Sequence, residues 1–270
     1  MLDHPHVSAT LPLLDGKIAV ISGAGSGLGQ AICLAFAAHG ARIAVGDLDG
    51  EAVEAATTAV RDAGGEATGR QTDIRDPAAC AALVEHARAS YGRIDVLVND
   101  AYHGGDFTLF EAADLTRWKE TAEVNLWGTL RMTQAALGEL KRAGDGRVVM
   151  ICTHGVELIQ PMFGAYTSSK AALAHATKLL AAELGGDGIR VNAVFPGPIF
   201  GPALRQYLAR SADAQGRTFD DVHREWAAKN ALHYLVPAEE IAGSVVFLAS
   251  DLSLPITGQA LYANAGEVFH

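Results

Sequence analysis

The chain has 270 residues, of which 49% are hydrophobic and 19% charged, a composition typical of a folded globular protein and not of a disordered one. Its formal net charge of −10 argues against nucleic acid or an anionic membrane as the main partner, because both attract basic surfaces. No segment reaches the ~20 apolar residues that a membrane-spanning helix requires, so we expect no membrane partner.

Short β-branched or apolar segments alternate along the chain with longer, alanine-rich helical segments. The expected strands are Ile18–Ile21, Arg42–Gly46, Glu66–Thr72, Val96–Val98, Val148–Ile151, Arg190–Val194 and Gln259–Tyr262. The expected helices are Gln30–Ala38, Glu51–Ala63, Pro77–Ala89, Leu115–Lys141, Ala165–Leu184 and Ala238–Leu248. Strands that alternate with helices form βαβ crossovers. We therefore predict an α/β fold, a doubly wound parallel sheet of about seven strands with helices on both faces.

The chain shows no internal repeat and no low-complexity linker. We predict one domain over residues 15–270 that combines dinucleotide binding and catalysis, preceded by a flexible tail over residues 1–14. The tail has no basic segment followed by an apolar one, so it does not resemble a secretory signal.

Neither the cysteines nor the histidines indicate a disulfide framework or a metal site. The three cysteines, Cys33, Cys80 and Cys152, are odd in number and far apart in the chain. Such cysteines are typical of reduced thiols in a cytoplasm. The ten histidines lack the spacing of metal ligands. We therefore expect a cytoplasmic protein without a bound metal.

The first expected strand leads into a glycine-rich turn, Ser22-Gly23-Ala24-Gly25-Ser26-Gly27-Leu28-Gly29, which opens an apolar helix. Glycines allow both the tight turn and the close approach of a pyrophosphate. The helix N-terminus then offers unpaired N–H groups to the phosphates. A glycine cluster can be a plain turn, but this one follows a strand early in a βαβ chain. We therefore predict that the turn binds a dinucleotide.

The second expected strand is followed by Asp47, 18 residues after Gly29. An acidic side chain at about this spacing contacts the adenosine ribose of a dinucleotide. A carboxylate there accepts hydrogen bonds from the ribose hydroxyls and repels the 2′-phosphate of NADP. Neither the glycine turn nor Leu48 supplies a basic side chain that offsets this repulsion. We expect NAD as the cofactor; the alternative is a loop aspartate that begins a turn.

Tyr166 and Lys170 are four residues apart in an expected helix, so both side chains lie on one helical face. A nearby ammonium favours the phenolate and lowers the pKa of a tyrosine. Such a tyrosine can act as a general base or acid. By itself, Tyr-x-x-x-Lys is also a common pattern on helix surfaces.

Together with the glycine turn and Asp47, this pair makes the chain resemble the short-chain dehydrogenase/reductase family over nearly all of residues 15–266. Gly23, Gly27 and Gly29 have the spacing typical of its short, single-domain branch. The other segments that resemble the family are Asp73-Ile74, Asn99-Asp100-Ala101-Tyr102, Val124-Asn125-Leu126-Trp127-Gly128, Asn192-Ala193-Val194-Phe195-Pro196-Gly197 and Thr257-Gly258-Gln259.

The resemblance implies a Rossmann-like fold and an NAD(H)-dependent enzyme that interconverts a secondary alcohol and a ketone. It implies that Tyr166 transfers the substrate proton. Lys170 would bind the nicotinamide ribose and lower the tyrosine pKa, and Asn125 would hold a water in the proton relay. The expected cofactor-binding residues are Ser22, Gly23, Gly25, Ser26, Gly27, Leu28, Gly29, Asp47, Leu48, Asp73, Ile74, Asn99, Ala101, Tyr166, Lys170, Pro196, Gly197 and Ile199.

Two departures from the family pattern fall near the expected reaction centre. The family usually has a serine 13 residues before the tyrosine, where this chain has Thr153. Threonine keeps the hydroxyl but has a restricted rotamer, so we expect Thr153 to act in place of the serine. The alternative is a strand-end threonine without a role. Tyr102 replaces a glycine and adds bulk beside the pocket.

The residues expected to line the substrate pocket are Tyr102, His103, Thr153, His154, Met162, Phe163 and Phe200. This aromatic and imidazole set favours a ring or a medium-sized apolar alcohol with a polar group; His103 and His154 can instead be exposed loop residues. Residues 198–236 resemble the mobile lid of the family, and such lids exclude water when they close.

The family commonly forms homotetramers or homodimers through the helices that contain Asn125 and Tyr166, and the resemblance implies the same here. Two other functions stay open. One is a dinucleotide-binding regulatory protein with little turnover. The other is an acyl-thioester ketoreductase, although the acidic chain offers no obvious basic docking surface for a carrier protein.

Overall fold

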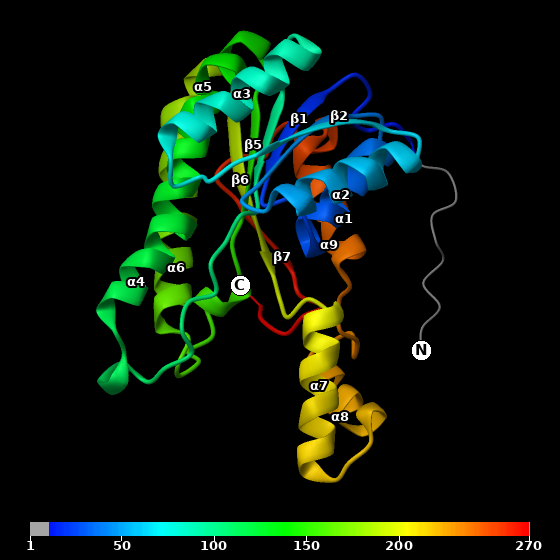
Figure 1. Ribbon diagram of the computed structural model, residues 1–270, viewed down its shortest axis with the longest axis vertical. Helices are drawn as coiled ribbons and strands as arrows, with labels where there is room; N and C mark the ends of the chain where they lie inside the picture. Colours follow the sequence, from blue (N-terminus) through cyan, green and yellow to red (C-terminus); the bar gives the residue numbers. More distant parts are fainter. Residues whose placement is uncertain (1–10, 270) are drawn as a thin grey trace.

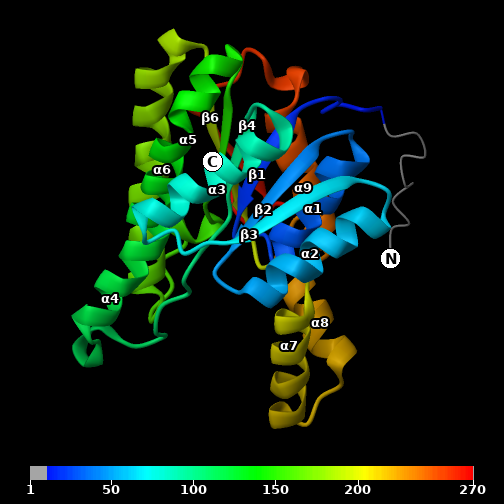
Figure 2. The ribbon, with the colours of Figure 1, turned by 45° about the horizontal axis from the view of Figure 1, so that its top comes forward.

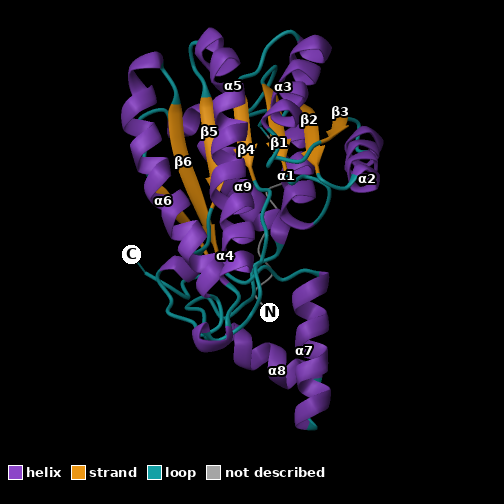
Figure 3. Ribbon diagram, turned by 60° about the vertical axis from the view of Figure 1, so that its left-hand side comes forward, coloured by secondary structure: helices purple, strands orange, loops and turns teal. Residues whose placement is uncertain are grey.

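The computed structural model describes residues 11–269, and these contain a single parallel sheet of seven strands. The strand order is β3-β2-β1-β4-β5-β6-β7, with the strands coloured orange in Figure 3. The strands are β1 Ile18–Ser22, β2 Arg42–Asp47, β3 Glu66–Gln71, β4 Val96–Asn99, β5 Arg147–Ile151, β6 Arg190–Pro196 and β7 Ala260–Ala263. The prediction of a doubly wound parallel sheet is confirmed.

Helices cover the sheet on both faces, as Figures 1 and 2 show. On one face lie α1 Gly27–Ala38, α2 Gly50–Asp62 and α9 Ala238–Ala249; on the other lie α3 Pro77–Tyr91, α5 Thr129–Ala143 and α6 Gly164–Leu184. Every residue of β1 is buried, as expected for a central parallel strand. Because strand side chains alternate between faces, Ile21 packs in the α1 layer and Val20 in the α3 layer.

The segment expected as one helix, Leu115–Lys141, is divided in the structure, so this expectation was wrong. α4 Leu115–Ala122 is followed by the π-helical turn η2 Glu123–Gly128 and then by α5. Gly128 packs closely against the loop between β3 and α3. A Cβ on Gly128 would lie only 2.7 Å from Cγ1 of Ile74 in that loop, so the position requires glycine. The wider turn also directs Asn125 inwards, where its side chain is fully buried. The other short helices are η1 Phe110–Ala112, η3 His154–Val156, η4 Gly185–Asp187 and η5 Asp251–Ser253.

The boundary expected after residue 14 needs a correction. Leu14 is fully buried in the core, and its N–H donates a 2.9 Å hydrogen bond to the carbonyl of His39. Because the core holds Leu14, the domain begins before residue 15. The rest of the expected tail, residues 1–10, lies outside the described residues.

Residues 198–236, the segment expected as a lid, form regular structure. They contain α7 Pro202–Gln215 and α8 Phe219–Ala227, which project beyond the sheet in Figures 1 and 3. The projection has a small apolar cluster of its own, formed by Leu208, Ala212, Val222, Ala227 and Leu235. At its base, the N–H of Leu232 donates to the carbonyl of Ala265 at 3.0 Å, so the projection is tied to the C-terminal segment.

Candidate active site

A cleft of about 760 Å³ opens at the carboxyl ends of the strands. It lies where the strand order reverses between β1 and β4, the position at which doubly wound sheets bind ligands. The residues that line the cleft are Gly23, Ser26, Gly27, Leu28, Asp47, Leu48, Thr72, Asp73, Ile74, Arg75, Asp100, Ala101, Tyr102, His103, Phe107, Val124, Ile151, Cys152, Thr153, Tyr166, Lys170, Pro196, Gly197, Pro198, Ile199, Gly201, Pro202, Ala203 and Leu204. The cleft thus brings together most of the residues predicted to bind the cofactor.

The turn requires glycine at Gly27 and at Gly29 for different structural reasons. Gly27 has a φ of +58°, and a Cβ on it would meet nothing within 4 Å, so the backbone there faces open space in the cleft. A Cβ on Gly29 would lie 2.2 Å from the carbonyl oxygen of Gly23, which closes the turn tightly. Ser26 makes no side-chain cap to α1, so the first N–H groups stay available to an anion. This cradle fits a dinucleotide diphosphate.

The carboxylate of Asp47 is held at the edge of the cleft by two backbone donors. Its Oδ2 accepts from the N–H of Gly25 at 3.0 Å, and its Oδ1 accepts from the N–H of Asp49 at 3.1 Å. Arg75, which sequence reasoning missed, also lines the cleft. Its guanidinium is engaged by Asp73, with the closest pair 2.6 Å apart.

Tyr166 and Thr153 line the opposite wall of the cleft. The N–H of Gly155 donates to Oγ1 of Thr153 at 3.1 Å, so the threonine hydrogen is free to donate to the phenol oxygen. Burial raises the pKa of Tyr166 above its usual range, while the hydrogen bond from Thr153 lowers it. The ring of Tyr102 stands edge-on to that of Tyr166, with centroids 6.3 Å apart.

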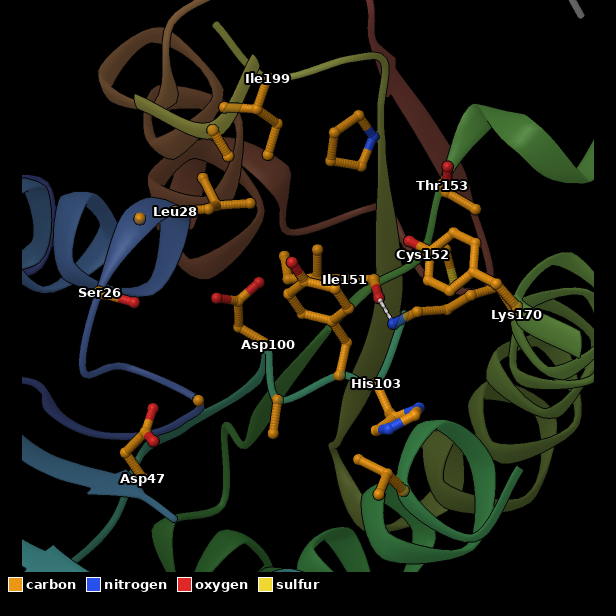
Figure 4. Close-up of a pocket in the computed structure, with 18 of the residues that line it drawn as sticks. Ser26, Leu28, Asp47, Asp100, His103, Ile151, Cys152, Thr153, Lys170 and Ile199 are labelled. Carbon is orange, nitrogen blue, oxygen red and sulfur yellow. Dashed lines mark hydrogen bonds between the residues drawn. The ribbon is translucent and has the colours of Figure 1, made fainter. Parts of the chain in front are cut away.

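Lys170 lies behind this pair, with its side chain buried in the protein. Its Nζ donates to the carbonyl oxygen of Ile151 at 2.6 Å, the hydrogen bond drawn in Figure 4. Burial lowers the pKa of Lys170. Lys170 is not among the groups that shift the pKa of Tyr166, which burial raises, so the expected effect of the lysine on the phenol stays a prediction.

Asn125 does not line the cleft, because its carboxamide is occupied elsewhere. Its Oδ1 accepts from the N–H of His103 at 2.7 Å, and its Nδ2 donates to the carbonyl of His103 and to Oγ of Ser169, both at 2.9 Å. Both amide hydrogens are therefore used. In this geometry the side chain holds the β4–α4 loop against α6. That Asn125 holds a relay water stays a prediction.

The expected substrate residues divide into two groups. Tyr102, His103 and Thr153 line the cleft. His154, Met162, Phe163 and Phe200 do not. His154 is buried beneath the C-terminal segment, with its Nε2 3.8 Å from Oε2 of Glu267, so it is neither a pocket residue nor an exposed loop histidine.

The aromatic residues of that second group pack on neighbouring side chains. Phe163 packs on Phe107, with ring centroids 4.7 Å apart, and Phe107 is the member of the pair that lines the cleft. Phe200 packs on His223 of α8, with centroids 5.0 Å apart. The apolar walls of the pocket therefore come from Tyr102, as expected, and from two residues that were not expected, Phe107 and Leu204 at the start of α7.

Four expected cofactor residues, Ser22, Gly25, Gly29 and Asn99, lie behind the cleft wall and shape it. Asn99 donates to Oγ1 of Thr133 at 3.0 Å and thereby joins β4 to α5. Three of the residues that sequence reasoning missed directly follow strand ends: Thr72 after β3, Asp100 after β4 and Cys152 after β5. Their position at the carboxyl edge of a parallel sheet is the signal that can identify them.

Two other findings concern metals and membranes. Among residues 11–269, no group of three or more His, Cys, Asp or Glu side chains is placed to hold a metal ion. Within the same range, no helix combines the length and the apolar character needed to cross a bilayer.

Comparison with known proteins gives consistent matches along the chain. A family model described as enoyl-(acyl carrier protein) reductase matches residues 23–267. The D-threitol dehydrogenase of Mycolicibacterium smegmatis is 35% identical over 263 residues, which cover 94% of this chain and 93% of that protein. An NAD⁺-bound xylitol dehydrogenase superposes with a TM-score of 0.86 at 27% identity, over 94% of this chain and 99% of that one. A variant of actinorhodin polyketide ketoreductase with NADPH superposes with a TM-score of 0.85 at 30% identity, over 93% and 97% of the two chains.

Proposed function

This chain belongs to the short-chain dehydrogenase/reductase family of oxidoreductases that act on CH–OH groups, and we propose that it interconverts a secondary alcohol and a ketone with NAD(H). The observation that carries the proposal is that Tyr166 and Thr153 line the same cleft as the glycine turn and Asp47. A proton-transferring group thus shares one cavity with a cradle for a dinucleotide.

The chemistry divides into a hydride and a proton. The nicotinamide, when bound, accepts or donates the hydride of the substrate carbon. In the oxidation, the phenolate oxygen of Tyr166 accepts the proton of the substrate hydroxyl as the carbonyl forms, and in the reduction it returns that proton. Thr153 Oγ1 orients the phenol oxygen and the substrate oxygen. Lys170 keeps two N–H donors beyond its bond to Ile151, and these would hold the nicotinamide ribose.

Asp47 supports NAD over NADP as the dinucleotide. Its carboxylate is held at the edge of the cleft by Gly25 and Asp49, so it cannot easily turn away from a ribose 2′-phosphate. Arg75 is the basic side chain on this wall, but Asp73 already neutralises it. An added phosphate would meet the Asp47 carboxylate without an unpaired cation beside it.

The pocket beside Tyr166 supports a ring or medium-sized alcohol of mixed polarity. Tyr102, Phe107 and Leu204 provide apolar surface, and His103 provides a polar group. The α7–α8 segment contributes Gly201 to Leu204 to the wall, which fits a lid over the substrate. The three cysteines are free and buried, which supports the cytoplasm as the location.

The experiment is a screen of cyclic, aromatic and sugar alcohols for reduction of NAD⁺, with NADP⁺ in parallel. We expect a wild-type preference for NAD⁺ of at least about tenfold, because one uncompensated charge contact changes binding by about 1.4 kcal/mol or more. Tyr166→Phe should lower kcat/KM by about 10²–10⁴-fold, because it removes the proton-transferring group. Tyr91→Phe, remote from the cleft at the end of α3, is the matched control and should keep wild-type activity. Equal activity of Tyr166→Phe and wild type would contradict the role of Tyr166, and a tenfold preference for NADP⁺ would contradict that of Asp47.

The similarity to a polyketide ketoreductase supports one second candidate, the reduction of an acyl-thioester ketone. The same screen separates the two functions when β-ketoacyl thioesters are included with NADH and NADPH. Turnover of the thioester in preference to every free alcohol would favour the second candidate. Dinucleotide binding without turnover of any substrate would instead indicate a regulatory protein.

A further inference from the structure

Asp100 is a carboxylic acid in a part of the cleft that is otherwise built for a dinucleotide. It follows β4 directly and lines the cleft, yet its side chain is buried. In Figure 4 the carboxylate points into the pocket between Asp47 and Lys170. Within residues 11–269, the carboxylate forms no hydrogen bond. An unpartnered, buried carboxylate is costly when it is ionised, and this position therefore requires an explanation.

The carboxylate lies at the helix end that serves as the phosphate cradle. Its Oδ2 is 2.9 Å from the point that a Cβ on Gly29 would occupy, in the first turn of α1. The carbonyl oxygen of Gly23 is 2.2 Å from the same point, so a hydrogen-bond acceptor lies on the same side of Gly29 as the Asp100 carboxylate. A neutral carboxylic acid can donate a hydrogen bond to such an acceptor, and a carboxylate cannot.

The charged and titratable groups around Asp100 come from four elements and from its own loop. Asp47, the last residue of β2, raises its pKa, and Lys170 on α6 lowers it. Cys33 on α1 and Tyr166 on α6 have pKa values raised by burial, and they face Asp100 as neutral groups. Cys152 after β5 has a pKa raised to about 12. Tyr102 and His103 follow Asp100 in the same loop.

Burial is the largest influence on Asp100, and it raises the pKa of the carboxyl to about 7. A dinucleotide diphosphate at the N-terminus of α1 brings further negative charge to the same helix end. Like charges disfavour the ionised form of an acid, so the bound state should hold the proton more tightly than the free protein.

We propose that Asp100 takes up a proton from solvent when the dinucleotide binds, so that the cleft holds its cofactor with a neutral carboxylic acid in its wall. The balance is one proton added to the carboxylate oxygen and no electron transferred. By reciprocity, deprotonation of Asp100 weakens binding by the same factor. The inference rests on dinucleotide binding in this cleft, which the proposed function shares, but it does not depend on which substrate is oxidised.

The test is calorimetric titration of the full chain with NAD⁺ at several pH values between 6 and 9, each in two buffers of different ionisation enthalpy. The difference in heat between the buffers gives the number of protons taken up. We expect an uptake that approaches one proton per site near pH 8, and a Kd that rises about tenfold for each pH unit above the pKa of the free protein. The absence of proton uptake at every pH would overturn the proposal.

Asp100→Asn is the decisive variant, because it keeps the shape and removes the titration. It should show no proton uptake and should bind NAD⁺ more tightly than wild type at pH 8, by about tenfold. Asp106→Asn is the matched control, since Asp106 lies in the same loop but outside the cleft and pairs with Arg117. It should titrate as wild type does. Proton uptake of equal size in Asp100→Asn would assign the proton to another group, such as His103 or Lys170, and would overturn the proposal.

A cofactor-free measurement keeps the inference separate from the choice of cofactor. The folded pKa of Asp100 lies above the ordinary value of 3.8, so stability falls as the pH rises from about 4 to about 7. Asp100→Asn should therefore raise the Tm above that of wild type at pH 8 and leave it close to wild type at pH 4. If Asp100→Asn and wild type have equal Tm values at both pH values, the burial of an ionised group at this position is contradicted. If the protein binds NADP⁺ and not NAD⁺, the proposed preference for NAD is wrong. The same titration with NADP⁺ then still tests whether Asp100 takes up a proton on binding.

Discussion

At the scale of single residues, the proton affinity of Tyr166 depends on where the hydroxyl hydrogen of Thr153 points. The backbone N–H of Gly155 occupies one lone pair of the Thr153 hydroxyl and leaves its hydrogen for Tyr166. This hydrogen bond lowers the pKa of a phenol that burial otherwise raises. Thr153 therefore influences the proton affinity of Tyr166 as well as the orientation of a substrate oxygen.

Replacement of Thr153 tests this influence through the pH profile of the oxidation. Because the Tyr166 pKa is raised, the rate of oxidation should increase with pH over the alkaline range. Thr153→Ala removes the hydrogen bond that lowers the pKa, so the alkaline limb should move to higher pH and kcat/KM at pH 8 should fall about 10–100-fold. Thr153→Ser keeps the hydroxyl and should retain the wild-type profile within a few fold. Identical profiles for Thr153→Ala and wild type would assign the threonine no part in proton transfer.

At the scale of elements, the π-helical turn η2 joins three parts of the chain that meet at the cleft. It directs Asn125 into the protein, where the carboxamide binds both backbone groups of His103 and the hydroxyl of Ser169 on α6. The loop that carries Tyr102 and His103 is thereby fixed relative to the helix that carries Tyr166. We infer that Asn125 acts as a positioning residue for the pocket wall.

Two substitutions at Asn125 separate its acceptor from its donors. Asn125→Ala removes all three hydrogen bonds and should destabilise the fold by about 1–3 kcal/mol, because the part-buried N–H and carbonyl of His103 and the buried hydroxyl of Ser169 lose this partner. Asn125→Asp keeps the acceptor for the N–H of His103 and loses both donors. Hydrogen exchange should therefore be fast at the His103 amide in Asn125→Ala and slow in Asn125→Asp and wild type. Unchanged protection of this amide in Asn125→Ala would show that the loop is held by other contacts.

At the scale of the whole molecule, the outer surface near α5 and α6 keeps apolar side chains exposed. Trp127 in η2 is 52% exposed and Leu179 on α6 is 53% exposed. An exposed apolar surface on long helices fits an interface with a second copy of the chain. We propose a homotetramer or homodimer formed through these helices, as the family resemblance implies.

Sedimentation of the purified chain tests this assembly. Wild type should sediment as a dimer or tetramer, and Leu179→Glu should shift the population toward smaller species because it places a charge in the interface. Leu252→Glu is the matched control, since Leu252 is also exposed but lies in η5. A wild-type monomer, or equal dissociation by both substitutions, would contradict the proposed interface.

Much of the fold and half of the site follow from local sequence patterns. Alternating strands and helices predict the parallel sheet, and the glycine turn after β1 predicts the phosphate cradle, because both depend on neighbouring residues. The break in the helix expected over Leu115–Lys141 could not be predicted in this way. It depends on packing of Gly128 against Ile74, two residues far apart in the chain.

By itself, the sequence determined the doubly wound sheet, the dinucleotide turn and the placement of Tyr166 and Lys170 on one face of a helix, since spacing along the chain decides each of these. Only the tertiary structure decided that His154 is buried against Glu267 and that Asn125 holds the His103 loop. It also decided that Asp100 is a buried acid in the cleft wall. The physical reason is that burial and hydrogen bonding arise from the surrounding segments, and these come together only when the chain folds.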